Sequence, residues 1–97
     1  MTRNTQISLT GYIDVPADRR AAIAAALPEH IALTRAEPGC LRFDVTEDTA
    51  CPGRFLVSEL FVSQADFDAH QARAADSPWA KITAGIPRHY SIEEISV

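Results

Sequence analysis

The stretch RFLVSELFVSQADFDAH, residues 54–70, decides the fold because two hydrophobic periods meet inside it. Its first eight residues alternate between two faces, which predicts a β-strand. One face of that strand carries Phe55, Val57, Glu59 and Phe61. Ser63 then has the form of a helix N-cap, and Phe67 and His70 share one side of the helix that follows. A strand therefore leads directly into a crossover helix.

Three more strands and a longer helix are predicted around this unit. The strands come from period-two alternation over residues 7–15, 41–46 and 88–97. Residues 17–36 predict an amphipathic helix, because apolar residues recur there every four positions. Proline lacks an N–H, so Pro28 predicts either a kink in this helix or two separate segments. A short helix is expected to start at Ser77-Pro78 and to run to about residue 84.

The predicted order is β-α-β-β-α-β. With right-handed crossovers this order gives a ferredoxin-like α+β fold, an antiparallel sheet with the helices on one face. A length of 97 residues fits a single domain spanning residues 1–97, with residues 1–5 as a flexible arm. The strand at 54–61 is apolar on both faces, since Leu56 and Leu60 lie opposite its other apolar residues. The uncovered sheet face therefore predicts a homodimer packed sheet against sheet.

Composition excludes several classes of partner. The formal net charge of −4 argues against nucleic acid and against an anionic membrane surface. No apolar run approaches 18 residues and the first residues lack a signal-peptide segment, so a cytoplasmic protein is expected.

Cys40 and Cys51 should lie at opposite ends of one strand, too far apart for a disulfide, and neither has metal-ligand neighbours. No metal site is predicted.

Two ionisable residues interrupt faces that are otherwise apolar. Glu59 does so in the strand and His70 in the helix after it. Burying an ionisable group is costly unless it is paired, so both are candidate catalytic residues. Histidine suits a general base, and a buried carboxylate beside it would orient the imidazole. Two alternatives stay open: His70 is a satisfied core or interface residue, or Glu59 forms an ion pair with Arg35 or Arg42.

A second group of residues could form the walls of a substrate pocket. The candidates are His30, Tyr12, Phe43, Phe67 and Trp79. His30 lies at the edge of the apolar stripe of the first helix, and the aromatic residues fit a core equally well. The sequence alone leaves open whether Glu59 and His70 meet in one cavity.

These residues also carry a family resemblance. The chain resembles the antibiotic biosynthesis monooxygenase domain family, small dimeric α+β-barrel proteins that include quinol monooxygenases. The resemblance covers about residues 7–95 and rests on His30, TRAEPGCL at 34–41 with Phe43, ELF at 59–61 and FDAH at 67–70. It implies a homodimer with a pocket between sheet and helices in each subunit. It also implies oxygen chemistry on a small aromatic or quinol-like ligand, with no metal, flavin or haem cofactor.

The chain departs from parts of the family pattern. Phe61 stands where family proteins often have tryptophan, two residues after the strand glutamate. Haem-degrading relatives use an asparagine in the first strand and a histidine downstream of a tryptophan. The first strand here has no asparagine, and Trp79 is not followed by histidine at a comparable position, so haem degradation is not expected.

The expected function is a cofactor-independent monooxygenase that acts on a small phenolic or quinol substrate with O₂. Two alternatives stay open at this point. One is a non-oxidative isomerase-type enzyme acting on a small carbonyl compound, and the other is a small-ligand binding module of the same fold.

Overall fold

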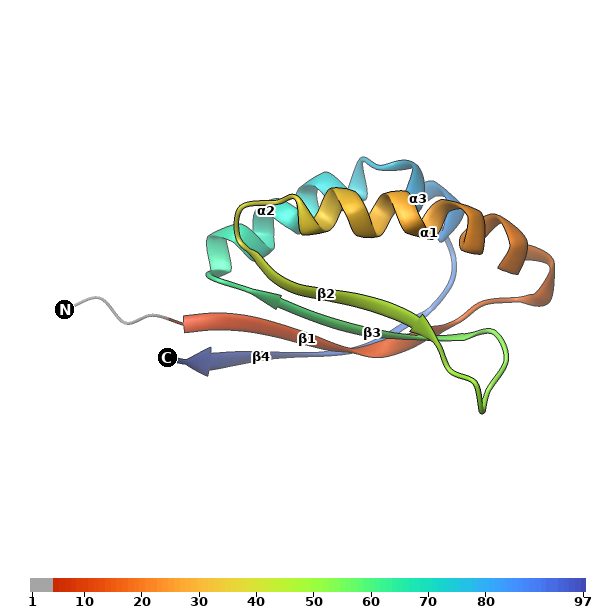
Figure 1. Ribbon diagram of the computed structural model, residues 1–97, viewed down its shortest axis with the longest axis horizontal. Helices are drawn as coiled ribbons and strands as arrows, with labels where there is room; N and C mark the ends of the chain where they lie inside the picture. Colours follow the sequence, from red (N-terminus) through yellow and green to blue (C-terminus); the bar gives the residue numbers. More distant parts are fainter. Residues whose placement is uncertain (1–4) are drawn as a thin grey trace.

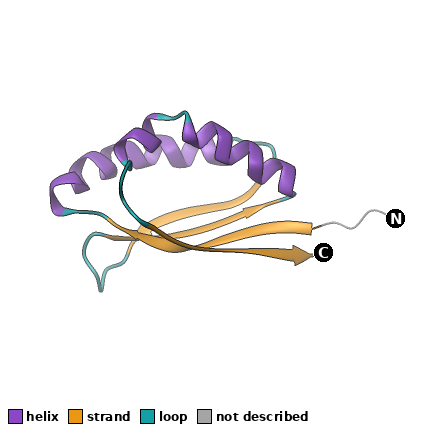
Figure 2. Ribbon diagram, turned by 180° about the vertical axis from the view of Figure 1, so that it is seen from behind, coloured by secondary structure: helices purple, strands orange, loops and turns teal. Residues whose placement is uncertain are grey.

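Two layers make up the protein, which a computed structural model describes over residues 5–97 (Figure 1). The strands are β1 (Thr5–Asp14), β2 (Cys40–Glu47), β3 (Arg54–Phe61) and β4 (Arg88–Ser96). They form one antiparallel sheet in the order β2-β3-β1-β4. The helices are η1 (Ala17–Arg19), α1 (Arg20–Arg35), α2 (Gln64–Ala75) and α3 (Pro78–Ile82). α1 and α2 both cover the same face of the sheet (Figure 2), which confirms the predicted ferredoxin-like arrangement.

Two details differ from the sequence-based expectations. Of the two alternatives predicted at Pro28, the division into two segments is wrong, because α1 runs unbroken through this residue. Pro28 and Ala24 are both exposed, so water can reach the Ala24 carbonyl whose helical partner the proline removes. Most of the predicted N-terminal arm, residues 1–4, lies outside the described residues, and Thr5 is the first residue of β1.

The strand register directs the candidate catalytic glutamate toward the helices. Glu59 in β3 lies opposite Leu9 in β1 and Phe43 in β2. All three are buried, so they occupy the sheet face that the helices cover. Phe55, Val57 and Phe61 are buried on the same face, as the alternation predicts. A shift of one residue would move Glu59 to the opposite face, and the hydrophobic pattern opposes that shift.

Local capping fixes where the two C-terminal helices begin. The Ser63 hydroxyl accepts a hydrogen bond from the Asp66 backbone N–H, and the Ser77 hydroxyl accepts one from Ala80. Each such N-cap contributes about 1 kcal/mol. Gly39 lies just before β2, where a Cβ would collide with the Asp66 side chain. The turn after α1 therefore packs directly against the start of α2, which brings residue 37 close to α2.

The other sheet face is open. Among the described residues no helix covers it, and Leu56 is 42% exposed there. Tyr12 also lies on this face, where its ring stacks on His89 and beneath the Arg54 guanidinium. No helix within residues 5–97 is long and apolar enough to cross a membrane.

Candidate functional site

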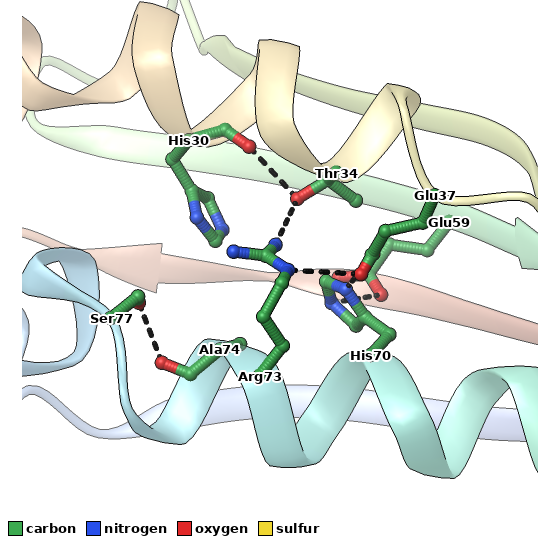
Figure 3. Close-up of polar contacts among 8 residues, drawn as sticks. All are labelled: His30, Thr34, Glu37, Glu59, His70, Arg73, Ala74 and Ser77. Atoms are coloured by element: carbon green, nitrogen blue, oxygen red, sulfur yellow. Dashed lines mark hydrogen bonds and ion pairs between the residues drawn. The ribbon is translucent and has the colours of Figure 1, made fainter.

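His70 is held by a carboxylate that comes from a different part of the chain. It projects from α2 toward the sheet and is only 3% exposed. Its Nδ1 lies 2.7 Å from Oε1 of Glu37, in the turn after α1 (Figure 3). A carboxylate only accepts hydrogen bonds, so Nδ1 carries a proton and donates it. In the neutral imidazole the Nε2 atom is then free to accept a proton, which is the state that a general base needs.

A chain of hydrogen bonds supports Glu37 from behind. Arg73, one helical turn after His70, donates from Nε to Oε2 of Glu37 at 3.0 Å. The same guanidinium donates to the Thr34 hydroxyl at 3.0 Å, and that hydroxyl donates to the His30 carbonyl at 2.8 Å. Both carboxylate oxygens of Glu37 are therefore paired. The network connects α1 to α2 and fixes the orientation of the His70 ring.

Glu59 faces the other nitrogen of the same imidazole. Its Oε1 lies 3.7 Å from His70 Nε2, which is close enough for electrostatic attraction but longer than a hydrogen bond. Within the described residues Oε1 has no hydrogen-bond partner, and the residue is 6% exposed. Burial, reinforced by the negative charge of Glu37, raises the pKa of Glu59 to about 7. Near neutral pH this carboxyl can therefore act as a proton donor.

The alternative ion pairs for Glu59 are not formed. Arg35 instead donates to the Phe43 carbonyl and to Asp44, both at 3.0 Å. Arg42 points to the opposite sheet face, because the side chains of neighbouring residues alternate and Phe43 is buried on the helix side. The structure therefore brings together His70 and Glu59, the two residues that the sequence proposes as catalytic.

The raised pKa of Glu59 predicts a pH-dependent stability. In the unfolded chain the group titrates near its ordinary value of 4.5, and in the folded protein near 7. Its contribution to folding is therefore fully present below about pH 4.5 and is lost as the pH rises through 7. Glu59→Gln has no carboxyl to ionise and therefore does not lose stability in this way. The free energy of unfolding of the variant minus that of the wild type should rise by about 1 to 3 kcal/mol from pH 5 to pH 8.

Urea unfolding at several pH values would measure this change. Glu29→Gln, which alters an exposed carboxyl on α1, is the matched control and should show no such trend. A stability difference for Glu59→Gln that stays constant with pH would contradict the raised pKa.

A cavity of about 250 Å³ opens beside the Glu59–His70 pair. Its walls come from β1, α1, β3, α2, α3 and β4: Leu9, His30, Glu59, His70, Gln71, Ala74, Ala75, Trp79, Ala80, Arg88 and Tyr90. The His30 and Trp79 rings stack with centroids 4.7 Å apart and an interplanar angle of 7°. Burial, with the nearby charge of Arg73, lowers the pKa of His30 to about 4, so this ring is neutral at neutral pH. Burial raises the pKa of Tyr90 to about 12.

The remaining pocket candidates lie elsewhere. Phe43 and Phe67 are buried in the core and do not line the cavity. Phe43 packs on both His30 and His70, and Phe67 packs on Phe61. Tyr12 does not reach the cavity, because it lies on the open sheet face with its ring against His89. Of the five wall candidates, His30 and Trp79 line the cavity.

Several residues of the candidate site were not among those predicted from the sequence. Glu37 lies in the quoted EPG motif but its contact with His70 spans 33 positions of sequence. Arg73 carried one usable signal, its spacing of three from His70 on a helix. Arg88 and Tyr90 lie in the strand predicted at residues 88–97, but nothing in its alternation marks them as cavity residues. Within residues 5–97, no cluster of three or more His, Cys, Asp or Glu side chains is placed to hold a metal ion.

Comparisons with known proteins agree with this architecture. The family model described as antibiotic biosynthesis monooxygenase matches residues 6–77. No curated protein sequence matches the chain. A solved structure from Nitrosomonas europaea that carries the same family name has a TM-score of 0.76 at 21% identity, covering 100% of this chain and 93% of that one.

Two further solved structures share the fold. A conserved protein of unknown function from Bacteroides thetaiotaomicron has a TM-score of 0.77 at 21% identity, over 97% of this chain and 99% of that one. Rv0793 from Mycobacterium tuberculosis has a TM-score of 0.71 at 24% identity, over 91% and 92%. At these identities the structural likeness establishes the fold, whereas the family model spans well over half of the chain. The chain therefore belongs to the antibiotic biosynthesis monooxygenase family.

Proposed function

We propose that this protein is a cofactor-free monooxygenase that inserts one oxygen atom of O₂ into a small phenol or quinol. The observation that carries the proposal is the pairing of two groups at one cavity. His70 presents an acceptor nitrogen there, and Glu59 presents a buried carboxyl with a raised pKa. Family membership supports oxygen chemistry at this site.

The chemistry begins with the weak reactivity of O₂ toward closed-shell molecules. Transfer of the phenolic proton to Nε2 of His70 makes an electron-rich phenolate, and Glu37 stabilises the imidazolium that results. The phenolate then passes one electron to O₂, and the two radicals combine to form a C–O bond. Protonation by the Glu59 carboxyl helps the resulting peroxide to break its O–O bond.

For a hydroquinone, the balanced outcome is a hydroxyquinone and one water molecule. One atom of O₂ enters the ring and the other leaves as water, and the substrate supplies all four electrons. The reaction therefore needs no external reductant. The expected absence of a metal or flavin requirement stays a prediction.

An oxygen electrode tests the proposal directly. Chelator-treated protein should consume one O₂ per hydroquinone, at a rate proportional to protein concentration. Mass spectrometry with ¹⁸O₂ should find one labelled atom in the hydroxylated product. Uptake that starts only after flavin or iron is added would overturn the cofactor-free proposal.

The same acid and base also favour a second candidate, isomerisation of a small enolisable carbonyl compound. His70 would remove the α-proton, and the Glu59 carboxyl would donate a hydrogen bond to the developing oxyanion. Exchange of the α-proton in D₂O, without oxygen uptake, would identify this activity. Binding of a ligand without either reaction would instead identify a small-ligand binding module.

We expect the protein to act as a homodimer with the open sheet faces packed together. The support is the uncovered face with Leu56 exposed, in a chain too short to cover both faces of its sheet. Sedimentation at micromolar concentration should give twice the monomer mass of 10.6 kDa. A monomer under these conditions would contradict the expectation. The cytoplasmic location likewise stays a prediction.

A further inference from the structure

The cavity beside His70 contains an arginine that is not held by any other group. Arg88, the first residue of β4, lines the cavity and is exposed to solvent. Within residues 5–97 its guanidinium has no hydrogen-bond or ion-pair partner. Arg73, the arginine behind His70, differs because Glu37 and Thr34 already occupy it. Arg88 is therefore free to bind a ligand.

The charges on the cavity wall make Arg88 the dominant feature for a charged ligand. His30 and Tyr90 are neutral near pH 7, since burial lowers the pKa of the first and raises that of the second. Glu59 is partly protonated at that pH. Arg88 supplies the one guanidinium cation among the described residues that line the cavity.

The cavity is large enough for a small aromatic ligand. An apolar cavity of about 150 Å³ already holds benzene. The 250 Å³ beside His70 therefore has room for an aromatic ring with substituents. The parallel His30 and Trp79 rings provide a flat aromatic wall against which such a ring can pack.

We propose that the substrate is a small phenol that carries a carboxylate, and that Arg88 binds this carboxylate. The inference rests on the proposed function only for the orientation of the bound ligand, in which a ring hydroxyl points toward His70. Arg88 and Tyr90 are two residues apart on the same face of β4, so the guanidinium lies at the β4 side of the cavity. Guanidinium and carboxylate match in a bidentate, charge-assisted pair. Arg88 is then the residue that selects anionic over neutral phenols.

Ligand binding to the intact protein tests this without any turnover. Trp79 is the sole tryptophan of the chain and lines the cavity, so its fluorescence reports on occupancy. Under anaerobic conditions, 2,5-dihydroxybenzoate should bind about tenfold more tightly than hydroquinone, which lacks only the carboxylate. A tenfold ratio corresponds to about 1.4 kcal/mol. The ratio should fall as salt is added.

Two variants separate Arg88 from a general effect of charge. Arg88→Gln should bind 2,5-dihydroxybenzoate and hydroquinone with about equal affinity. Arg42→Gln, which removes an exposed arginine on the opposite sheet face, should keep the preference for the carboxylate. Equal affinities in the wild type, a preference that survives Arg88→Gln, or no binding of either ligand at millimolar concentration would overturn the inference.

The outcome is distinguishable from that of the oxygenation assay. A carboxylate preference that depends on Arg88, without oxygen uptake, would support the binding inference and count against the monooxygenase. Oxygen uptake with hydroquinone, without such a preference, would support the monooxygenase and remove the role of Arg88.

Discussion

His70→Ala should lower the turnover of a quinol-type substrate by about 10²-fold or more, the usual contribution of a general base. The imidazole is fixed between two carboxyl groups, with Glu37 at 2.7 Å on Nδ1 and Glu59 at 3.7 Å from Nε2. Alanine leaves no group at the cavity that can take the phenolic proton in the same position. Steady-state oxygen uptake, with kcat and KM measured separately, gives the size of the effect.

Two controls separate catalysis from folding. Asp68→Ala changes an exposed side chain on the same helix and should leave turnover unaltered. Thermal unfolding and sedimentation should show that the His70 variant keeps the wild-type fold and oligomeric state. If His70→Ala instead lowers stability by a kcal/mol or more and keeps its activity per molecule, His70 is a core residue and the catalytic assignment is wrong.

A double-mutant cycle tests whether His70 and Glu59 act together. Glu59→Gln keeps the shape of the side chain but cannot release a proton, so it should also reduce turnover. If the two groups depend on each other, the combined variant should lose less activity than the product of the separate losses. Losses that multiply would mean that the two residues contribute independently to turnover.

The second large effect is expected at Glu37, which positions His70 without touching the cavity. Glu37→Gln should reduce kcat by about 10- to 100-fold, the range found for groups that orient metal-bound histidines. Glutamine keeps the size of the side chain but lacks the negative charge that stabilises the imidazolium and pairs with Arg73. KM should change little, because Glu37 does not line the cavity.

Nitrogen-15 NMR of the imidazole distinguishes positioning from a purely structural role. In the wild type, Nδ1 should carry the proton, and the variant should show a mixture of tautomers. Glu29→Gln, an exposed change on α1, is the control and should leave both kcat and the tautomer as in the wild type. A wild-type kcat in Glu37→Gln would show that His70 is positioned by packing against Phe61 and Phe43 alone.

The order of strands and helices follows from local patterns in the sequence. Alternation in residues 54–61, followed by the Ser63 cap, fixes β3 and the start of α2 because those signals act between near neighbours. The same alternation places Glu59 among buried residues, and the helix period places His70 with Phe67. The two central site residues were therefore identifiable as ionisable groups on apolar faces.

The partners of those residues were decided by the tertiary structure. The contact between Glu37 and His70 joins the end of α1 to α2, and no local periodicity encodes a contact across 33 residues. Arg88 and Tyr90 reach the cavity because the register of β4 against β1 sets them opposite Ile13 and Gly11. Tyr12 shows the same dependence, since its position in β1 turns it to the open face. Sequence fixes which residues can be buried, whereas strand register and helix packing decide which of them meet.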